Sequence, residues 1–203
     1  MKNIVLLFSM IVLGYMGVAQ KSKLSKGERT FAINYLKETQ SILLETVKDI
    51  DGELWNYKPS AESWPVAGCF EHILYAEGQL TKKVMEGMIA GEAAGGKNLA
   101  PEDGLVIAKV ADRSQKVKTP ESFEPSGRWP DKQAMINELN RSRAELISFV
   151  ETTKVDLRSF KANSPVGERD AYQHLLIVAG HGLRHTMQMK EVIEAYKATA
   201  SSK

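Results

Sequence analysis

The sequence predicts an all-α protein, and more specifically a four-helix bundle. Four long segments carry apolar side chains at helical spacing, no segment shows the alternation of a strand, and charged residues are interspersed along the chain. The 203 residues have an ordinary globular composition and a net charge of +2. A bundle buries four amphipathic stripes together. A net charge this small gives no reason to expect nucleic-acid binding.

The first nineteen residues predict a signal peptide. Lys2 precedes an uncharged apolar stretch at 4–16, and Gly17 and Ala19 suit the positions before a cleavage site. The stretch is short for a membrane span, which needs about 20 residues. We therefore expect a signal peptide at 1–19 and one domain at 20–203. The protein would be exported, periplasmic or secreted, with no membrane contact after signal removal.

The first helix is expected at 27–48. Ser25 is its candidate N-cap, and Asp51-Gly52 breaks the helical pattern after it. Its apolar stripe consists of Phe31, Leu36, Ile42, Leu43 and Val47.

An aromatic loop is expected at 53–64, because Pro59 prevents a helix from continuing through it. The second helix then starts near Pro65, with Ser63 as its cap, and runs to about residue 90. Four aromatic side chains are expected to pack against the bundle, with a place at the mouth of a site as the alternative: Trp55, Tyr57, Trp64 and Trp129.

The segment 91–127 is rich in Gly, Pro, Ser and Lys and has weak periodicity. It predicts a long irregular segment or a mobile cover between the second and third helices, long enough for a crossover. The third helix is expected at 131–153, and the fourth from Glu168 or Asp170 to about 198, since acids suit a helix N-terminus. The apolar positions of the third helix are Met135, Leu139, Leu146, Phe149 and Val150.

His181 and His185 stand four residues apart in the last predicted helix. This spacing puts the two imidazoles about 40° apart around the helix axis and about 6 Å apart along it, so both can face one ion. His174 lies about 10 Å further along the axis, too far to join them. A third ligand must come from another helix, and His72 is the remaining histidine. The alternative is that the histidines are unrelated residues of the interior or the surface.

Three neutral imidazoles with one open coordination position would suit Zn²⁺, or else Ni²⁺ or Fe²⁺. Glu71 and Glu77 flank His72 and are candidates for a base or a partner of the ligand, or else are acids facing solvent. Arg184 and Tyr75 are candidates to contact an anionic substrate, with surface roles as the alternative. Cys69, the single cysteine, is expected to be buried and unreactive.

Two segments resemble the DinB-like superfamily. Residues 54–77, LWNYKPSAESWPVAGCFEHILYAE, resemble its aromatic-Pro-Trp loop leading into a helix with the first metal histidine. Residues 181–189, HGLRHTMQM, resemble its last-helix HxxxH segment, with Gln188 at a motif position of unclear role. The resemblance implies a four-helix bundle with a divalent metal, Zn²⁺ first among the candidates, bound by His72, His181 and His185.

The resemblance specifies the activity less closely than it specifies the fold and the metal ligands. It implies a metal-dependent hydrolase acting on a small molecule, with a thiol-dependent transferase or a non-catalytic metal- or ligand-binding domain as alternatives. The predicted export disfavours a cytosolic thiol cofactor. Many members have Arg-Gly where this chain has Thr186-Met187, so the substrate stays open, and no catalytic base is assigned. An exposed apolar stripe would allow a homodimer.

Overall fold

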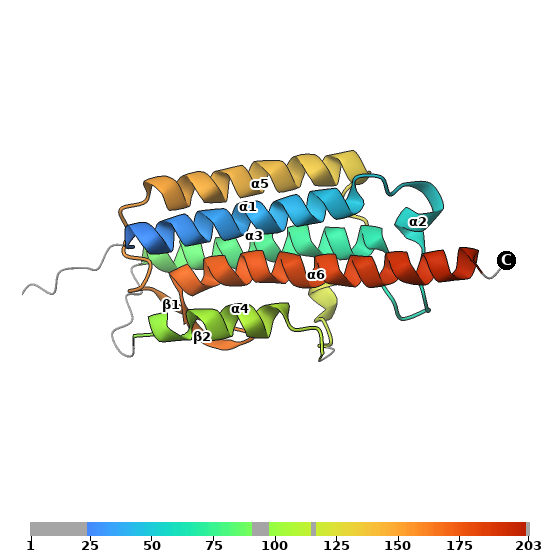
Figure 1. Ribbon diagram of the computed structural model, residues 1–203. Coiled ribbons are helices and arrows are strands. Elements are labelled where there is room, and N and C mark those ends of the chain that lie inside the picture. Colours follow the sequence, from blue (N-terminus) through green and yellow to red (C-terminus); the bar gives the residue numbers. More distant parts are fainter. Residues whose placement is uncertain (1–23, 91–97, 115–116, 202–203) are drawn as a thin grey trace, which may run out of the picture.

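The computed structural model describes residues 24–90, 98–114 and 117–201. The predicted signal peptide at 1–19 lies outside the described residues. Four long helices lie side by side (Figure 1): α1 (Lys26–Val47), α3 (Val66–Ala90), α5 (Lys132–Thr152) and α6 (Ala171–Ala200). α1 and α3 each pack against both α5 and α6. This arrangement confirms the predicted four-helix bundle.

Side-chain caps mark the N-termini of three of the four long helices. Ser25 accepts the backbone N–H of Glu28 at 3.1 Å, and Glu28 accepts the N–H of Ser25 at 2.8 Å, which completes a capping box on α1. The carboxylates of Asp131 and Asp170 cap α5 and α6 by accepting the backbone N–H groups of Ala134 and Gln173. α3 begins at Val66, which leaves the predicted cap Ser63 two residues too early, and the Ser63 hydroxyl bonds to that of Ser60.

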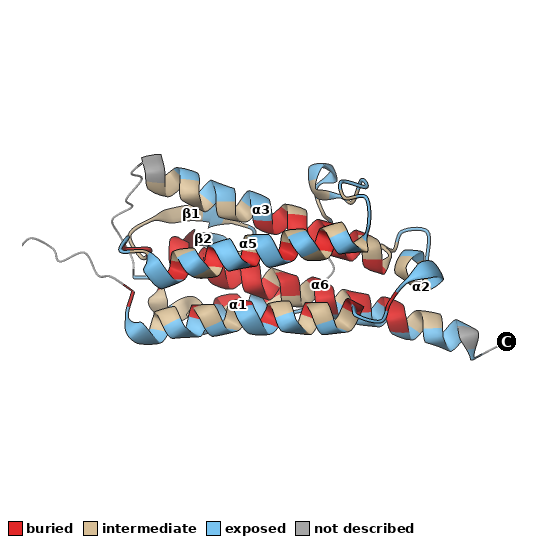
Figure 2. Cartoon of the chain, turned by 90° about the horizontal axis from the view of Figure 1, so that it is seen from above, coloured by how far each residue is buried: buried red, intermediate tan, exposed pale blue. Residues whose placement is uncertain are grey.

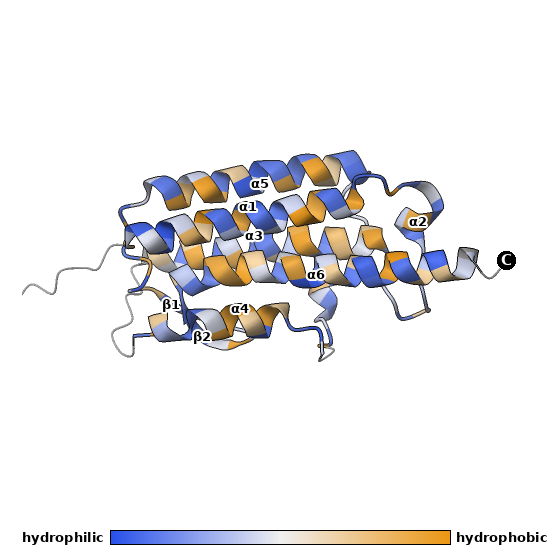
Figure 3. Cartoon of the chain, in the orientation of Figure 1, coloured by the Kyte–Doolittle hydropathy of each residue, from blue (hydrophilic) through white to orange (hydrophobic). Residues whose placement is uncertain are grey.

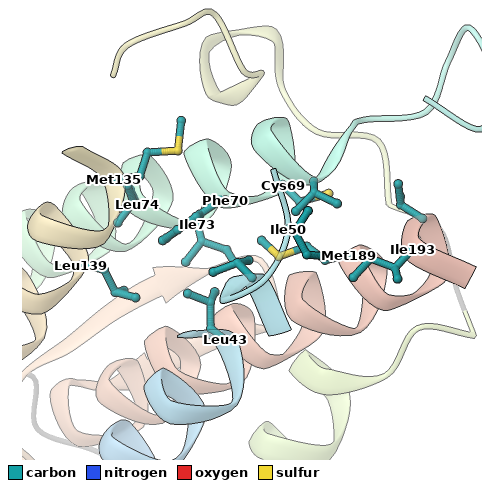
Figure 4. Packing of buried hydrophobic residues seen from close by; sticks show 13 residues of the cluster. Leu43, Ile50, Cys69, Phe70, Ile73, Leu74, Met135, Leu139, Met189 and Ile193 are labelled. Carbon is teal, nitrogen blue, oxygen red and sulfur yellow. The ribbon is translucent and has the colours of Figure 1, made fainter. Parts of the chain in front are cut away.

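Each long helix carries buried positions (Figure 2) and apolar positions (Figure 3) in stripes along its length. Most of the buried apolar side chains belong to two clusters. The first, shown in Figure 4, includes Phe70 and Ile73 of α3 and Met189 of α6. The second gathers around Leu36, Leu146 and Tyr172. Four aromatic residues pack against the first cluster, as expected: Trp55, Tyr57, Trp64 and Trp129. Trp55 belongs to a short helix, α2 (Gly52–Asn56), where the start of the loop was expected at 53–64.

The chain between α3 and α5 crosses the length of the bundle. α3 and α5 run in the same direction (Figure 1), so the chain must return along the bundle before α5 begins. This return contains a 3₁₀ turn, η1 (Ala100–Glu102), the helix α4 (Asp103–Ala111) and a second turn, η2 (Glu121–Phe123). α4 packs on α6, with Val106 and Val110 against Ile177. The predicted crossover is therefore present, but its described part is more ordered than the expected irregular segment.

A short hairpin connects α5 to α6. Strands β1 (Lys161–Ser164) and β2 (Gly167–Asp170) pair antiparallel, with Lys161 opposite Asp170. Gly167 has a φ of +100°, which a side chain would strain. The sequence did not predict this hairpin, because two four-residue polar strands are too short to show an alternating pattern. None of the helices in the described part of the chain is long and apolar enough to cross a membrane.

Candidate metal site

Three histidines from two helices meet in the bundle interior. His72 comes from α3, and His181 and His185 come from neighbouring turns of α6. One ring nitrogen from each lies within 4.8 Å of the others. The Nε2 atoms of His72 and His181 are 3.2 Å apart. The structure thus brings together the three residues that the sequence singled out.

A main-chain carbonyl orients the His72 ring. His72 Nδ1 lies 2.9 Å from the carbonyl oxygen of Phe123, at the end of η2. Since a carbonyl only accepts, Nδ1 carries the proton and Nε2 keeps its lone pair. That lone pair is available to an ion shared with α6.

Gln188 gives His185 the same kind of support. His185 Nδ1 lies 2.8 Å from Gln188 Oε1, so it donates and again leaves Nε2 as the free lone pair. Gln188 Oε1 also accepts from Arg113 Nη1 at 3.5 Å, and Arg113 is held by Glu191 through bonds of 2.8 and 2.5 Å. The motif position of unclear role is therefore the one that fixes the His185 tautomer.

His181 lacks such a partner. Its Nδ1 is buried without a hydrogen-bond partner among the described residues. Its Nε2 faces the Nε2 of His72, whose proton sits on the other ring nitrogen. Two imidazole nitrogens approaching this closely must share a proton or a cation.

Burial keeps the three imidazoles neutral. Desolvation lowers the pKa of His72, and it lowers the pKa of His181 still further, helped by its histidine neighbours. The pKa of His185 falls to about 3, chiefly through burial and then through the nearby His72. Neutral imidazole is the form that binds metal ions.

The spacing of the His72 and His181 nitrogens fits a first-row divalent ion, and the whole group lies within 4.8 Å. Zn–N bonds of 2.0–2.1 Å in a tetrahedral arrangement place the ligand nitrogens about 3.3 Å apart. The 3.2 Å separation of the His72 and His181 nitrogens matches this spacing. All three donors are nitrogens, which suits Zn²⁺, Ni²⁺ or Fe²⁺ better than Mg²⁺ or Ca²⁺.

His174 takes no part in this group, as helix geometry predicted. Its Nδ1 donates to the carbonyl of Asp170 at 2.9 Å, and its ring lines a separate small apolar cavity between α3, α5 and α6. Burial lowers its pKa as well.

Trp64 forms one wall of the site. Its ring centroid lies 4.9 Å from that of His72 and 6.1 Å from that of His185. Of the aromatic residues considered for the site mouth, Trp64 therefore contacts the histidines, whereas Trp55 packs on Phe70 and Tyr57 on Tyr196.

Neither acid beside His72 is available as a base. Glu71 and Glu77 are only 4% and 5% exposed, so the expectation that they face solvent is wrong. Glu71 accepts three backbone N–H groups and the guanidinium of Arg128. Burial raises its pKa, but these hydrogen bonds outweigh burial and leave the pKa below its usual value. Glu77 is held by Arg143.

Tyr75 and Cys69 are held by packing, whereas Arg184 lies near enough to the histidines for its charge to lower the pKa of His181 and His185. Tyr75 packs against Phe123, with ring centroids 5.4 Å apart, and lies under the Arg128 guanidinium. Arg184 is half-buried, and its charge interacts with Arg113 and Asp112. Cys69 is fully buried, and burial raises the pKa of its thiol to about 12, so it is unreactive as expected.

Comparison with known proteins places this site in a family context. A sequence model of the DinB superfamily matches residues 35–189. The uncharacterized protein YuaE of Bacillus subtilis (strain 168) is 28% identical over 159 residues, covering 74% of this chain and 92% of YuaE. YfiT from Bacillus subtilis, described as a probable metal-dependent hydrolase with an unusual four-helix bundle topology, matches with a TM-score of 0.52 and 11% identity, over 85% of this chain and 90% of YfiT. The second likeness shows a shared fold.

Proposed function

Given that this chain belongs to the DinB superfamily, as its motifs predict, we propose that it is a metal-dependent hydrolase. His72, His181 and His185 would hold the ion. The observation that carries the proposal is their convergence as neutral imidazoles, with ring nitrogens within 4.8 Å of one another. The description of YfiT as a probable metal-dependent hydrolase supports the proposal through the shared fold.

Three protein ligands are the number typical of catalytic zinc sites, which leave the fourth position open. A divalent ion bound there would supply Lewis acidity and lower the pKa of a coordinated water. Zn²⁺ is the first candidate, followed by Ni²⁺ and Fe²⁺.

The surrounding residues would orient the ligands and limit access of solvent. The Phe123 carbonyl and Gln188 hold two imidazoles in the tautomer that presents Nε2. Trp64 covers one side of the histidines. Because Glu71 and Glu77 are already engaged, we assign no carboxylate as the base.

We also propose that the protein acts outside the cytoplasm. The support is the amino-acid sequence of residues 1–19, with its early lysine, apolar stretch and small residues. N-terminal sequencing of the protein recovered from the periplasm or medium should begin at Gln20. Recovery of the uncleaved chain from the cytoplasm would contradict export.

Metal analysis followed by a substrate screen tests the function. The purified protein should carry about one divalent ion per chain, and His181→Ala should lose it. His174→Ala is the matched control, since His174 is a buried histidine of the same helix outside the group. The metal-loaded protein should hydrolyse an ester or amide in the screen.

The other outcomes separate the alternatives. Metal-dependent conjugation of a thiol would identify a transferase. A protein that binds metal but turns over none of the substrates in the screen would be a non-catalytic metal-binding domain. Wild-type protein that binds no divalent ion would overturn the metal site itself.

A further inference from the structure

We propose that Glu71 is a positioning residue for His72, acting through the segment 122–128. Glu71 holds this segment in place, and Phe123 within it supplies the carbonyl that orients the imidazole. The inference rests on the proposed metal function, and it gives a role to the acid that neither faces solvent nor is available as a base.

Glu71 fixes the segment because its single carboxylate accepts hydrogen bonds from three consecutive backbone N–H groups of the segment. Oε1 accepts the backbone N–H groups of Ser126 and Arg128 at 2.7 and 3.2 Å, and Oε2 accepts that of Gly127 at 2.9 Å. Gly127 has a φ of +78°, a conformation that glycine adopts readily. Charge-assisted bonds of this kind are stronger than neutral ones.

Arg128 links Glu71 to two further residues of the same segment. It donates to Glu71 Oε1 at 2.8 Å, and also to the carbonyls of Glu124 and Ser122 at 2.8 and 3.3 Å. Its guanidinium lies 4.1 Å from the ring centroid of Tyr75 on α3. The residues on either side of Phe123 are thereby tied to one cation, which is itself tied to Glu71.

The Phe123 carbonyl is therefore fixed relative to α3. His72 donates to it at 2.9 Å, from the residue that directly follows Glu71. Two adjacent residues of α3 thus bind the segment, Glu71 through its carboxylate and His72 through its imidazole. Loss of the Glu71 charge would release the carbonyl, and the His72 ring would no longer be held with Nε2 toward His181.

NMR of the metal-free protein tests the positioning step directly. In the wild type, the His72 imidazole Nδ1–H should be visible and exchange slowly with solvent, because it is buried and bonded to Phe123. Glu71→Gln keeps the shape but removes the charge and one acceptor, and should make this proton exchange at least tenfold faster. Glu28→Gln is the matched control, since Glu28 also accepts a backbone N–H and a guanidinium. It belongs to the first turn of α1, which lies at the opposite end of the bundle from the start of α3 (Figure 1).

Metal affinity is the second readout. Zn²⁺ competition with a chelator should show about tenfold weaker binding in Glu71→Gln, the usual effect of removing support from a metal-binding histidine, and wild-type affinity in Glu28→Gln. A purely structural role would lower the thermal stability of Glu71→Gln and leave both the His72 exchange rate and the Zn²⁺ affinity unchanged. That result would overturn the inference.

The two proposals fail in different ways. If the wild type binds no Zn²⁺, Ni²⁺ or Fe²⁺, the proposed function is wrong, and the exchange rate in metal-free Glu71→Gln still decides whether Glu71 positions His72. Should Glu71→Gln not fold, Arg128→Met removes the ties to Ser122 and Glu124 and is expected to accelerate exchange at His72 in the same way. Unchanged exchange in that variant would equally reject the role of the segment.

Discussion

Glu77 and Arg143 form a two-point ion pair inside the bundle, with Oε2···Nε and Oε1···Nη2 distances of 2.9 and 2.5 Å. Arg143 is 2% exposed and also donates to the Leu36 carbonyl and Thr39 hydroxyl, each at 3.3 Å. The guanidinium therefore links α1, α3 and α5 beside the histidine group. A charge this deeply buried is tolerated only with a partner.

Removing one partner of this pair should destabilise the fold strongly. Glu77→Leu leaves the Arg143 charge buried and unpaired, so the free energy of unfolding should fall by about 3–5 kcal/mol in a urea titration. The double variant Glu77→Leu/Arg143→Met should recover part of this loss, because neither charge remains. A single variant as stable as the wild type would show that the pair contributes nothing.

Gly182 makes room for the same pair. A Cβ at Gly182 would lie 2.9 Å from Glu77 Oε1 and 3.0 Å from Arg143 Nη2. Gly182→Ala should therefore displace the pair and cost about 1–3 kcal/mol in thermal unfolding, despite the better helix propensity of alanine. Gly78→Ala is the control: nothing lies within 4 Å of its Cβ, so it should gain up to about 1 kcal/mol. Equal stabilisation of both variants would refute the steric argument.

His174 should make stability depend on pH. Burial, followed by the charges of Lys83 and Arg169, lowers its pKa in the folded state. Below about pH 6.5 this histidine is protonated in the unfolded chain but stays neutral in the folded state. The free energy of unfolding therefore falls as the pH falls, by at most about 1.4 kcal/mol per pH unit. His174→Asn keeps a donor for the Asp170 carbonyl without the titration.

Urea titrations at pH 7 and pH 5, with a chelator present, check this difference. The loss of stability between the two values should be smaller in His174→Asn than in the wild type. An identical loss in both proteins would assign the pH dependence to other groups.

Gln188 should affect the affinity for metal rather than folding. Gln188→Ala removes the acceptor of the His185 Nδ1–H, so the dissociation constant for Zn²⁺ should rise about 10- to 100-fold in a chelator competition. Gln133→Ala changes an exposed glutamine of α5 that bonds to Asn137, and it should bind Zn²⁺ like the wild type. Equal affinity in both variants would mean that Gln188 does not hold the tautomer.

Sequence reasoning located the histidines because helix geometry leaves few choices. The spacing of His181 and His185 puts them on one face, and the same geometry excludes His174. His72 followed as the remaining histidine, and the family resemblance agreed with it. The acceptor for His72 was not predictable, because it is a main-chain carbonyl, and any residue at position 123 would supply one.

The buried ion pair of Arg143, which was not predicted, did have a signal in the sequence. Arg143 falls between Leu139 and Leu146 in the apolar stripe of α5, and a charged residue at a buried position indicates a charged partner. Helix α4 was missed because nine residues give too few turns to establish a period. Its place on α6 is decided by Val106, Val110 and Ile177, which are far apart in sequence.

The parallel course of α3 and α5 sets a minimum length for the chain that joins them (Figure 1). α5 has 21 residues, so the return path covers about 30 Å. An extended chain spans that distance with roughly nine residues. Residues 91–131 join the two helices, and the described part of this connection supplies α4, Arg113 and the Phe123 carbonyl. A shorter connection could keep the order of the helices. It would lose the Phe123 carbonyl that orients His72 and the Arg113 side chain that bonds to Gln188.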